Sequence, residues 1–423
     1  MREDFVIKGD ICFSLSANEL ITREDSFLVC ADGKVAGVFD KLPERFEHLK
    51  LYDYSGKLVI PGMSDLHVHA SQYAYRGLGM DLELLDWLNT ITFPHEARYE
   101  DVDFAKKAYG IFVDDMLKSE TTRACIFATV HVPATIALMD LFEKTGLKTY
   151  VGKVNMDRNC ADCLRETSAG SAEDTRQWIE AVNGRYENVR PIITPRFIPS
   201  CTDGLMRELS DIRARYDLPV QSHLSENLSE IEWVRELCPW SESYPDAYLK
   251  FGMLGGDTRT VMAHCVHVND EETDLLAERG VYVAHSPQSN ENLRSGVAPI
   301  KKMLKRGVKV GLATDVAGGS SLSMFRAVTD AIQCSKLRWR LSDDSFPALS
   351  MDEAFFLATK GSGEFFGKVG SFEEGYEFDA VVLDDSMLKT VIDLSLRQRL
   401  ERVLYLSNGR GIEAKFVSGT KVL

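Results

Sequence analysis

The amino-acid sequence predicts an α/β protein in which a (β/α)8 TIM barrel is joined to a small β-sandwich domain formed from both ends of the chain. Two observations support this fold. Between about residues 58 and 372, apolar strand-like runs alternate with helical stretches, a pattern typical of parallel βα units. Short extended pieces broken by turns occur before and after that region. We therefore expect a catalytic barrel domain over 58–372 and a small domain over 1–57 plus 373–423.

The small domain is predicted from turn-separated extended segments. One of its hairpins is marked by the Asp32-Gly33 pair, a dipeptide that favours a tight turn. The segments span residues 5–15, 26–39, 49–57, 376–385 and 403–423.

The barrel is predicted from eight strand-like runs and the helical stretches between them. Residues 101–119 and 270–280, for example, carry apolar side chains at helical spacing. The eight runs cover 57–69, 121–130, 148–156, 189–197, 218–225, 259–266, 281–287 and 309–318.

Size and composition agree with this organisation. A barrel needs about 250 residues, so a chain of 423 residues leaves room for one accessory domain. Hydrophobic residues make up 44% and charged residues 27%, which excludes a disordered or fibrous protein.

Charge excludes several classes of partner. The formal net charge is -15, whereas binding to nucleic acid or an anionic membrane depends on lysine and arginine. The first ten residues are charged where a signal peptide has an apolar core, and no apolar run approaches the ~20 residues that span a bilayer. We expect a cytoplasmic protein.

Nine cysteines are scattered without regular spacing. Cys160 and Cys163 form a CxxC pair, but a structural zinc site of this type needs a second pair. We interpret the cysteines as reduced thiols of a cytoplasmic protein.

The candidate active-site residues fall at the carboxyl ends of the predicted strands, where barrel enzymes hold their active sites. His67 and His69 are two residues apart on the first strand, so both side chains point to one side. His223, His264 and Asp315 end the fifth, sixth and eighth strands. One histidine in a strand is more often a satisfied core residue than a ligand, but five such positions at strand ends reverse that judgement.

Imidazole and carboxylate ligands suit a divalent ion such as Zn²⁺ or Fe²⁺. We assign His67, His69, His223 and Asp315 as ligands of that ion, with a coordination position left open for water. His264 is either a fifth ligand or a residue that orients the attacking water and polarises the substrate, and we favour the second role.

Glu226 is the predicted proton shuttle. It follows His223 by three residues, at the point where a strand gives way to a helix, so it can overhang the ion without binding it. The plain alternative is a carboxylate that complements a helix dipole. Among the other histidines, His285 is a candidate for the pocket wall and His95 for a lid, whereas His48, His131 and His267 are interpreted as structural or surface residues.

Four motifs carry a family resemblance. PGMSDLHVHASQ at 61–72, HLSEN at 223–227, MAHCVH at 262–267 and TDVAGG at 314–319 resemble the amidohydrolase superfamily. Within it, the chain resembles the guanine deaminases through HASQ at 69–72, residues 81–99, TPRF at 194–197 and residues 286–296. The resemblance covers nearly the whole chain.

The resemblance implies hydrolysis of guanine at C2 to xanthine and ammonia, with one zinc ion per subunit, Fe²⁺ being possible, in a homodimer. It implies that Gln72, Arg196 and Phe197 line the purine pocket, and that His223, Glu226 and His264 also contact the base. Asp315 would share proton transfer with Glu226. Arg196 stands where two-metal relatives have a modified lysine, which favours a single ion.

Two alternatives stay open at this stage. The Ser286-Pro287 and Glu291-Asn292 pairs depart from the family pattern, so the substrate could be another heteroaromatic amine, such as an oxidised purine, cytosine or a triazine. The other alternative is a non-catalytic relative that uses the barrel as a scaffold, although this chain retains all the predicted ligands.

Overall fold

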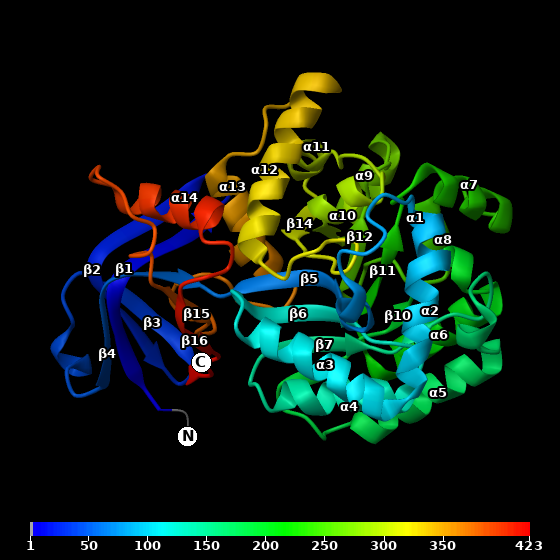
Figure 1. Ribbon diagram of the computed structural model, residues 1–423, viewed down its shortest axis with the longest axis horizontal. Helices are drawn as coiled ribbons and strands as arrows, with labels where there is room; N and C mark the ends of the chain where they lie inside the picture. The colour runs from blue at the N-terminus through cyan, green and yellow to red at the C-terminus, as the bar shows by residue number, and fades with distance from the viewer. Residues whose placement is uncertain (1–2) are drawn as a thin grey trace.

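Parallel strands wind into a barrel in the computed structural model, which describes residues 3–423 (Figure 1). Each of the eight predicted strand regions contains at least one strand, and the third and fourth regions are each divided by a short break. These strands are β5 (Met63–His69), β6 (Thr121–Phe127), β7 (Lys148–Gly152), β8 (Val154–Asn155), β9 (Val189–Pro191), β10 (Thr194–Pro195), β11 (Val220–Leu224), β12 (Thr260–His264), β13 (Tyr282–His285) and β14 (Lys309–Leu312).

Hydrogen bonds join two four-stranded sheets into a closed ring. The first sheet has the order β5-β6-β7-β9 and the second the order β11-β12-β13-β14. Ile193, just beyond β9, pairs in parallel with Val220 of β11. At the other junction the Asp315 amide, beyond β14, donates to the His67 carbonyl of β5 over 2.9 Å. The predicted (β/α)8 barrel is therefore confirmed.

Helices surround the strands on the outside of the ring (Figure 1). Several begin at side-chain caps, which satisfy amide groups that the helix leaves free. Asp101 accepts from the amides of Asp103 and Phe104 at the start of α3, for example. The helices are α3 (Val102–Leu117), α4 (Val132–Glu143), α5 (Ser168–Val182), α6 (Asp203–Tyr216), α7 (Leu228–Leu237), α8 (Tyr244–Lys250), α9 (Asp270–Glu278), α10 (Pro287–Asn292), α11 (Ile300–Lys305), α12 (Met324–Leu341) and α13 (Met351–Phe356).

A separate helical segment over residues 84–100 follows β5. It contains α1 (Leu84–Trp87), a wider turn over Leu88–Thr92 and α2 (Phe93–Glu96). This segment supplies part of the wall of the pocket described below.

Strands from both ends of the chain form a separate, mainly antiparallel sheet outside the barrel, on the left of Figure 1. Across residues 3–423 its order is β17-β16-β15-β4-β1-β2-β3. The strands are β1 (Phe5–Ser16), β2 (Glu19–Ala31), β3 (Lys34–Phe39), β4 (Lys50–Pro61), β15 (Ala380–Leu383), β16 (Ile412–Val417) and β17 (Thr420–Lys421).

This sheet curls over its own apolar core. Lys34 of the edge strand β3 pairs with Glu377, which lies just before β15. The rings of Phe5 and Phe416 lie 5.2 Å apart although three strand spacings separate their strands in the sheet order. The small domain is thus a sandwich made by one strongly bent sheet. The predicted domain boundaries stay predictions, and β4 continues past the first of them to Pro61.

The sequence interpretation of residues 403–423 as extended was wrong at its start. α14 (Leu396–Leu406) includes the first four of these residues. The helix begins at Ser395, whose side chain accepts from the Gln398 amide in a reciprocal capping box. Leu396, Leu400 and Val403 then bury one face at helical spacing, which outweighs the local strand propensity of the Val403–Leu406 run.

No helix among residues 3–423 is both long enough and apolar enough to cross a membrane.

A buried ion pair connects the barrel to the small sheet. Arg123 of β6 donates from Nε to Asp379 Oδ2 over 2.8 Å and from Nη2 to Glu377 Oε2 over 2.6 Å. The Arg123 and Asp379 side chains are 5% and 0% exposed. Removal of one partner from such a pair leaves the other charge buried and uncompensated.

We predict that Arg123→Met lowers the free energy of unfolding by about 3–5 kcal/mol, because it leaves the Asp379 carboxylate buried without its opposite charge. Urea unfolding followed by circular dichroism measures the change. Arg207→Met is the matched control, since its ion pair with Asp203 is on the surface, where such pairs contribute little. Equal unfolding midpoints for the two variants would contradict the predicted role of Arg123.

Candidate active site and metal centre

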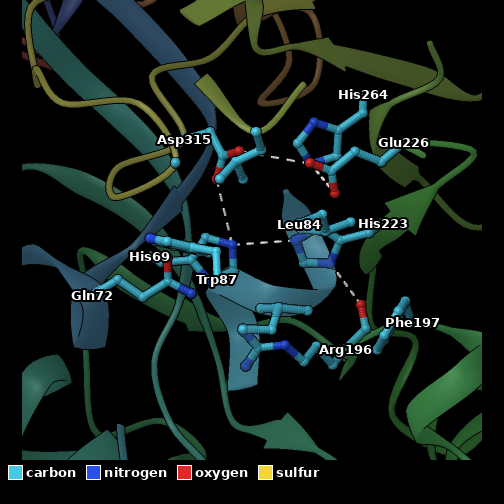
Figure 2. Close-up of a pocket in the computed structure, with 13 residues that line it drawn as sticks. His69, Gln72, Leu84, Trp87, Arg196, Phe197, His223, Glu226, His264 and Asp315 are labelled. Atoms are coloured by element: carbon cyan, nitrogen blue, oxygen red, sulfur yellow. Dashed lines mark hydrogen bonds and ion pairs between the residues drawn. The ribbon is translucent and has the colours of Figure 1, made fainter. Parts of the chain in front are cut away.

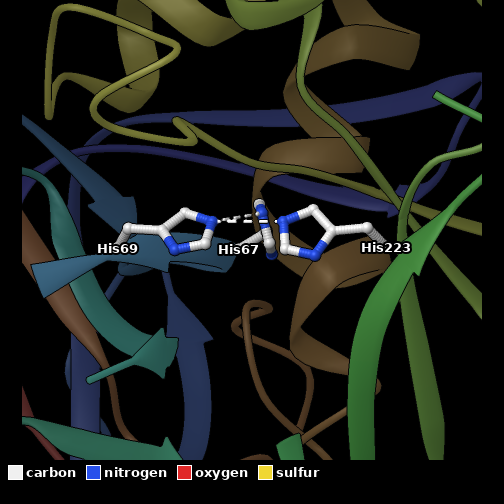
Figure 3. A group of neighbouring side chains, drawn as sticks. All are labelled: His67, His69 and His223. Atoms are coloured by element: carbon white, nitrogen blue, oxygen red, sulfur yellow. Dashed lines mark hydrogen bonds between the residues drawn. The ribbon is translucent and has the colours of Figure 1, made fainter. Parts of the chain in front are cut away.

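Five polar side chains meet at the carboxyl ends of the barrel strands. His67 and His69 extend from β5, His223 from β11 and His264 from the end of β12, and Asp315 follows β14. Figure 3 shows the imidazoles of His67, His69 and His223 turned toward one another. The closed ring brings these positions together although 248 positions of sequence separate His67 from Asp315.

The distances between the donor atoms fit a single metal ion. His69 Nε2 lies 3.1 Å from His67 Nε2 and 3.2 Å from His223 Nε2. Asp315 Oδ1 lies 3.2 Å from His67 Nε2 and 3.5 Å from His69 Nε2. A tetrahedral zinc ion with ligand bonds of about 2.0–2.1 Å holds its donor atoms about 3.3 Å apart. His69 Nε2 thus lies within 3.5 Å of a donor atom from each of the other three side chains, and this spacing fits ligands of one ion.

Protonation states also favour a cation at this point. Burial lowers the pKa of His67, His69 and His223 well below the usual 6.5, so the imidazoles are neutral at pH 7. The neutral imidazole is the form that binds metals. His223 Nδ1 lies 2.6 Å from the Arg196 carbonyl oxygen, which can only accept, so the hydrogen is on Nδ1 and the lone pair of Nε2 faces the cluster. Burial raises the pKa of Asp315 to about 6, and a cation would favour its ionised form.

His264 is oriented by a residue of α10. Its Nδ1 donates to Asn290 Oδ1 over 2.8 Å, which leaves the Nε2 lone pair facing the site. That Nε2 lies 3.4 Å from Glu226 Oε2 and 3.7 Å from Asp315 Oδ2. His264 can therefore accept a hydrogen bond from a water molecule held between the two carboxylates.

Glu226 lies in the turn between β11 and α7. The preceding Ser225 has φ of 49°, and Asn227 caps the helix, so Glu226 stands just before the helix, at the predicted junction of strand and helix. Burial, followed by the charges of Glu230 and Asp315, raises the pKa of Glu226 well above its ordinary value. A carboxyl group with a raised pKa can both accept and return a proton near neutral pH.

Glu230 holds this turn in place. Its Oε2 accepts from the Glu226 amide over 2.9 Å and from the Asn227 amide over 3.2 Å. Its Oε1 accepts from the Tyr244 hydroxyl over 2.6 Å. The shuttle candidate is thus fixed through its backbone, and its side chain is left facing the pocket.

A pocket opens beside these groups. Figure 2 shows Asp315, His264 and Glu226 on one side, Gln72 and Arg196 on the other, and His69 and His223 between them. The walls combine this polar set with apolar and aromatic side chains, as in a typical small-molecule site. Its lining residues are His69, Gln72, Leu84, Trp87, Leu88, Arg196, Phe197, His223, Glu226, His264, Leu293, Asp315 and Gly318.

The residues predicted to bind the metal, to carry out catalysis and to bind the substrate lie together in the structure. All of them line the pocket except His67, which contacts the lining residue His69. Two weaker predictions fall outside the pocket wall as described by residues 3–423. His285 is buried and does not line the pocket, and His95 bonds to the Ile91 carbonyl and packs on Tyr75.

Sequence reasoning identified Phe197 but missed the rest of the apolar wall. Leu84, Trp87 and Leu88 are spaced as one face of a helix, a pattern that also predicts ordinary core packing. Leu293 and Gly318 lie in loops after the seventh and eighth strands and carry no chemical signal of their own.

Comparisons with known proteins cover the whole of this architecture. Residues 58–422 match the model of the amidohydrolase family. The guanine deaminase of Rattus norvegicus is 40% identical over 377 residues, which cover 86% of this chain and 82% of that protein. The guanine deaminase of Dictyostelium discoideum is 36% identical over 408 residues, with coverage of 95% and 88%. A crystal structure of guanine deaminase from C. acetobutylicum, with guanine bound in its active site, has a TM-score of 0.97 and 46% identity and covers 100% of both chains.

We predict that His223→Asn lowers the divalent metal content of the purified protein far below one ion per chain, because it removes one of four converging donors. Inductively coupled plasma mass spectrometry measures the content. His48→Asn, on the surface, is the control and should bind as much metal as the parent protein. Parental metal content in the His223 variant would refute this ligand assignment.

Proposed function

The chain belongs to the guanine deaminases of the amidohydrolase family, and we propose from this membership that it hydrolyses guanine at C2 to xanthine and ammonia. One observation carries the proposal most directly. The metal-binding side chains share a pocket with Gln72 and Arg196, in a chain 46% identical over its full length to a guanine deaminase that binds guanine. The enzyme is thus a hydrolase for a C–N bond of a cyclic amidine and acts in purine catabolism or salvage.

The proposed cofactor is one Zn²⁺ per chain, bound by His67, His69, His223 and Asp315. Fe²⁺ is the alternative, because the same nitrogen and oxygen donors suit it. When bound, the ion would supply Lewis-acid activation of a water molecule. The 3.1–3.5 Å spacing of the donor atoms supports this assignment.

Glu226 and Asp315 accept and deliver the protons of the reaction. The water oxygen forms a bond to C2 while Glu226 accepts one of its protons and passes it to the adjacent ring nitrogen. His264 orients the water from the side, since its Nε2 lies between the two carboxylates. Asp315 takes the remaining proton of the added water from the new C2 hydroxyl, and this proton goes to the C2 amino group. The C2–N bond then breaks, and ammonia leaves while C2 becomes a carbonyl and the ring recovers its conjugation.

Apolar residues of the pocket pack against the faces of the base, and polar residues form hydrogen bonds with its edges. Phe197 offers a ring face and Trp87 and Leu84 add apolar surface, which suits a flat purine. Arg196 and Gln72 supply hydrogen-bond donors for the carbonyl side of the base. His223, Glu226 and His264 contact the edge that carries C2.

Assembly and location are part of the same proposal. We expect a homodimer, as the family resemblance implies, and a cytoplasmic enzyme, as the interpretation of the nine cysteines as reduced thiols suggests.

Incubation of the purified protein with guanine tests the function. We predict that the ultraviolet spectrum of guanine changes to that of xanthine with release of one ammonia per base. Failure to turn over guanine, together with turnover of another heteroaromatic amine such as cytosine or a triazine, would overturn the substrate assignment while leaving an aminohydrolase. Failure with every amine and with added Zn²⁺ or Fe²⁺ would support a non-catalytic scaffold.

We predict that Glu226→Gln lowers kcat by about 10²–10⁴-fold, because the amide cannot carry the proton from water to the ring. Metal content and KM should change little. Steady-state kinetics with guanine give both constants, and Glu232→Gln, an exposed carboxylate on α7, is the matched control. A kcat near that of the parent enzyme would rule out the shuttle role.

A further inference from the structure

Glu96 is a buried carboxylate behind the polar wall of the pocket. It is the last residue of α2, is 3% exposed, and does not itself line the pocket as described by residues 3–423. Its Oε1 accepts from Gln72 Nε2 over 2.9 Å, and its Oε2 accepts from Arg196 Nη1 over 2.7 Å. One carboxylate therefore connects the two side chains that are proposed to bind the base.

The contact with Glu96 fixes the orientation of the Gln72 amide. Gln72 Oε1 accepts from the Ala317 amide over 3.2 Å, while Nε2 donates to Glu96. A reversed amide would place its oxygen against the Glu96 carboxylate and its NH₂ against the Ala317 N–H, so both contacts would be lost. The Gln72 NH₂ group therefore has one N–H left, and this N–H can donate a hydrogen bond into the pocket.

Glu96 also compensates the buried charge of Arg196. The side chains of Arg196 and Glu96 are each 4% exposed, so the guanidinium has little contact with solvent. A buried cation is stable only when an opposite charge and hydrogen bonds satisfy it. With Nη1 turned to Glu96, the other guanidinium N–H groups remain for the pocket, and arginine offers no acceptor.

Donors thus line the end of the pocket away from the catalytic groups. Guanine presents two acceptors, O6 and N7, on the side of the purine away from C2, whereas a 6-aminopurine presents N7 and an amino donor. Figure 2 shows Gln72 and Arg196 across the pocket from Glu226 and Asp315, so a base with C2 toward these carboxylates would turn its 6-position toward Gln72 and Arg196. A 6-amino group there would meet donors and leave its own hydrogens unpaired.

We propose that Glu96 is a positioning residue that sets purine selectivity: it locks Gln72 and Arg196 as donors, so that the pocket accepts a 6-oxopurine and rejects a 6-aminopurine. The inference rests on the proposed function. It concerns how the pocket discriminates between bases that carry the same reactive C2 amino group.

Glu96→Gln tests the inference with guanine and 2,6-diaminopurine as paired substrates. Both carry a C2 amine, and they differ in the oxygen or amino group at C6. The glutamine at position 96 supplies one acceptor and one donor, so the Gln72 amide is free to turn over and present its oxygen to the base. Glu100→Gln, four residues along on the surface, is the matched control.

The parent enzyme should prefer guanine by at least about 100-fold in kcat/KM, as a site with placed hydrogen-bonding groups does. In Glu96→Gln that preference should fall by at least about tenfold, with most of the loss for guanine in KM and with unchanged metal content. Glu100→Gln should behave as the parent. An unchanged preference, or an equal loss of kcat/KM with both bases, would overturn the selectivity role.

A second variant guards against a folding defect. Glu96→Asp keeps the charge that Arg196 needs but is one methylene too short to hold both partners at their present distances. A folded Glu96→Asp enzyme with lowered guanine preference supports the inference, and one with parental preference overturns it. A parent protein inactive on guanine would instead refute the proposed function, so the two failures are distinguishable.

Discussion

The site depends on the closure of the barrel, which brings donor atoms of His67, His223 and Asp315 within 3.1–3.5 Å of His69 Nε2. Hydrogen bonds between the end of β14 and the end of β5 bring Asp315 beside His67. The imidazoles are buried and neutral, and their nitrogen atoms face one another with too few hydrogens to satisfy all of them. A divalent cation resolves this arrangement, so the metal site follows from the fold.

Two buried carboxylates near this centre serve different chemistry because their partners differ. Glu96 has both oxygens occupied by donors from Gln72 and Arg196, which suits a fixed structural anion. Glu226 faces the carboxylates of Asp315 and Glu230 in a desolvated turn, and its pKa is raised. The environment, and not the residue type, therefore separates a positioning group from a proton carrier.

Much of this organisation could be predicted from sequence, because strand periodicity and polar residues at strand ends are local signals. His67, His69 and Asp315 stand out in otherwise apolar runs, and Glu226 follows His223 closely. Glu96 could not be identified in this way, since a glutamate in a helical stretch is ordinarily a solvated residue. Its role depends on contacts with Gln72 and Arg196 that lie 24 and 100 positions away. The end of α14 was misinterpreted for the opposite reason, because a short Val-Leu-Tyr-Leu run was judged without the capped helix whose last residues it forms.

The most direct test of the account is a metal titration of stripped enzyme with guanine turnover as the readout. Protein freed of metal by a chelator is mixed with increasing equivalents of Zn²⁺, and the initial rate of xanthine formation is measured after each addition. The account predicts no turnover without metal and a linear rise that ends at one equivalent per chain, because one set of four donors binds one ion. Turnover by the metal-free protein, or a plateau at two equivalents, would contradict it.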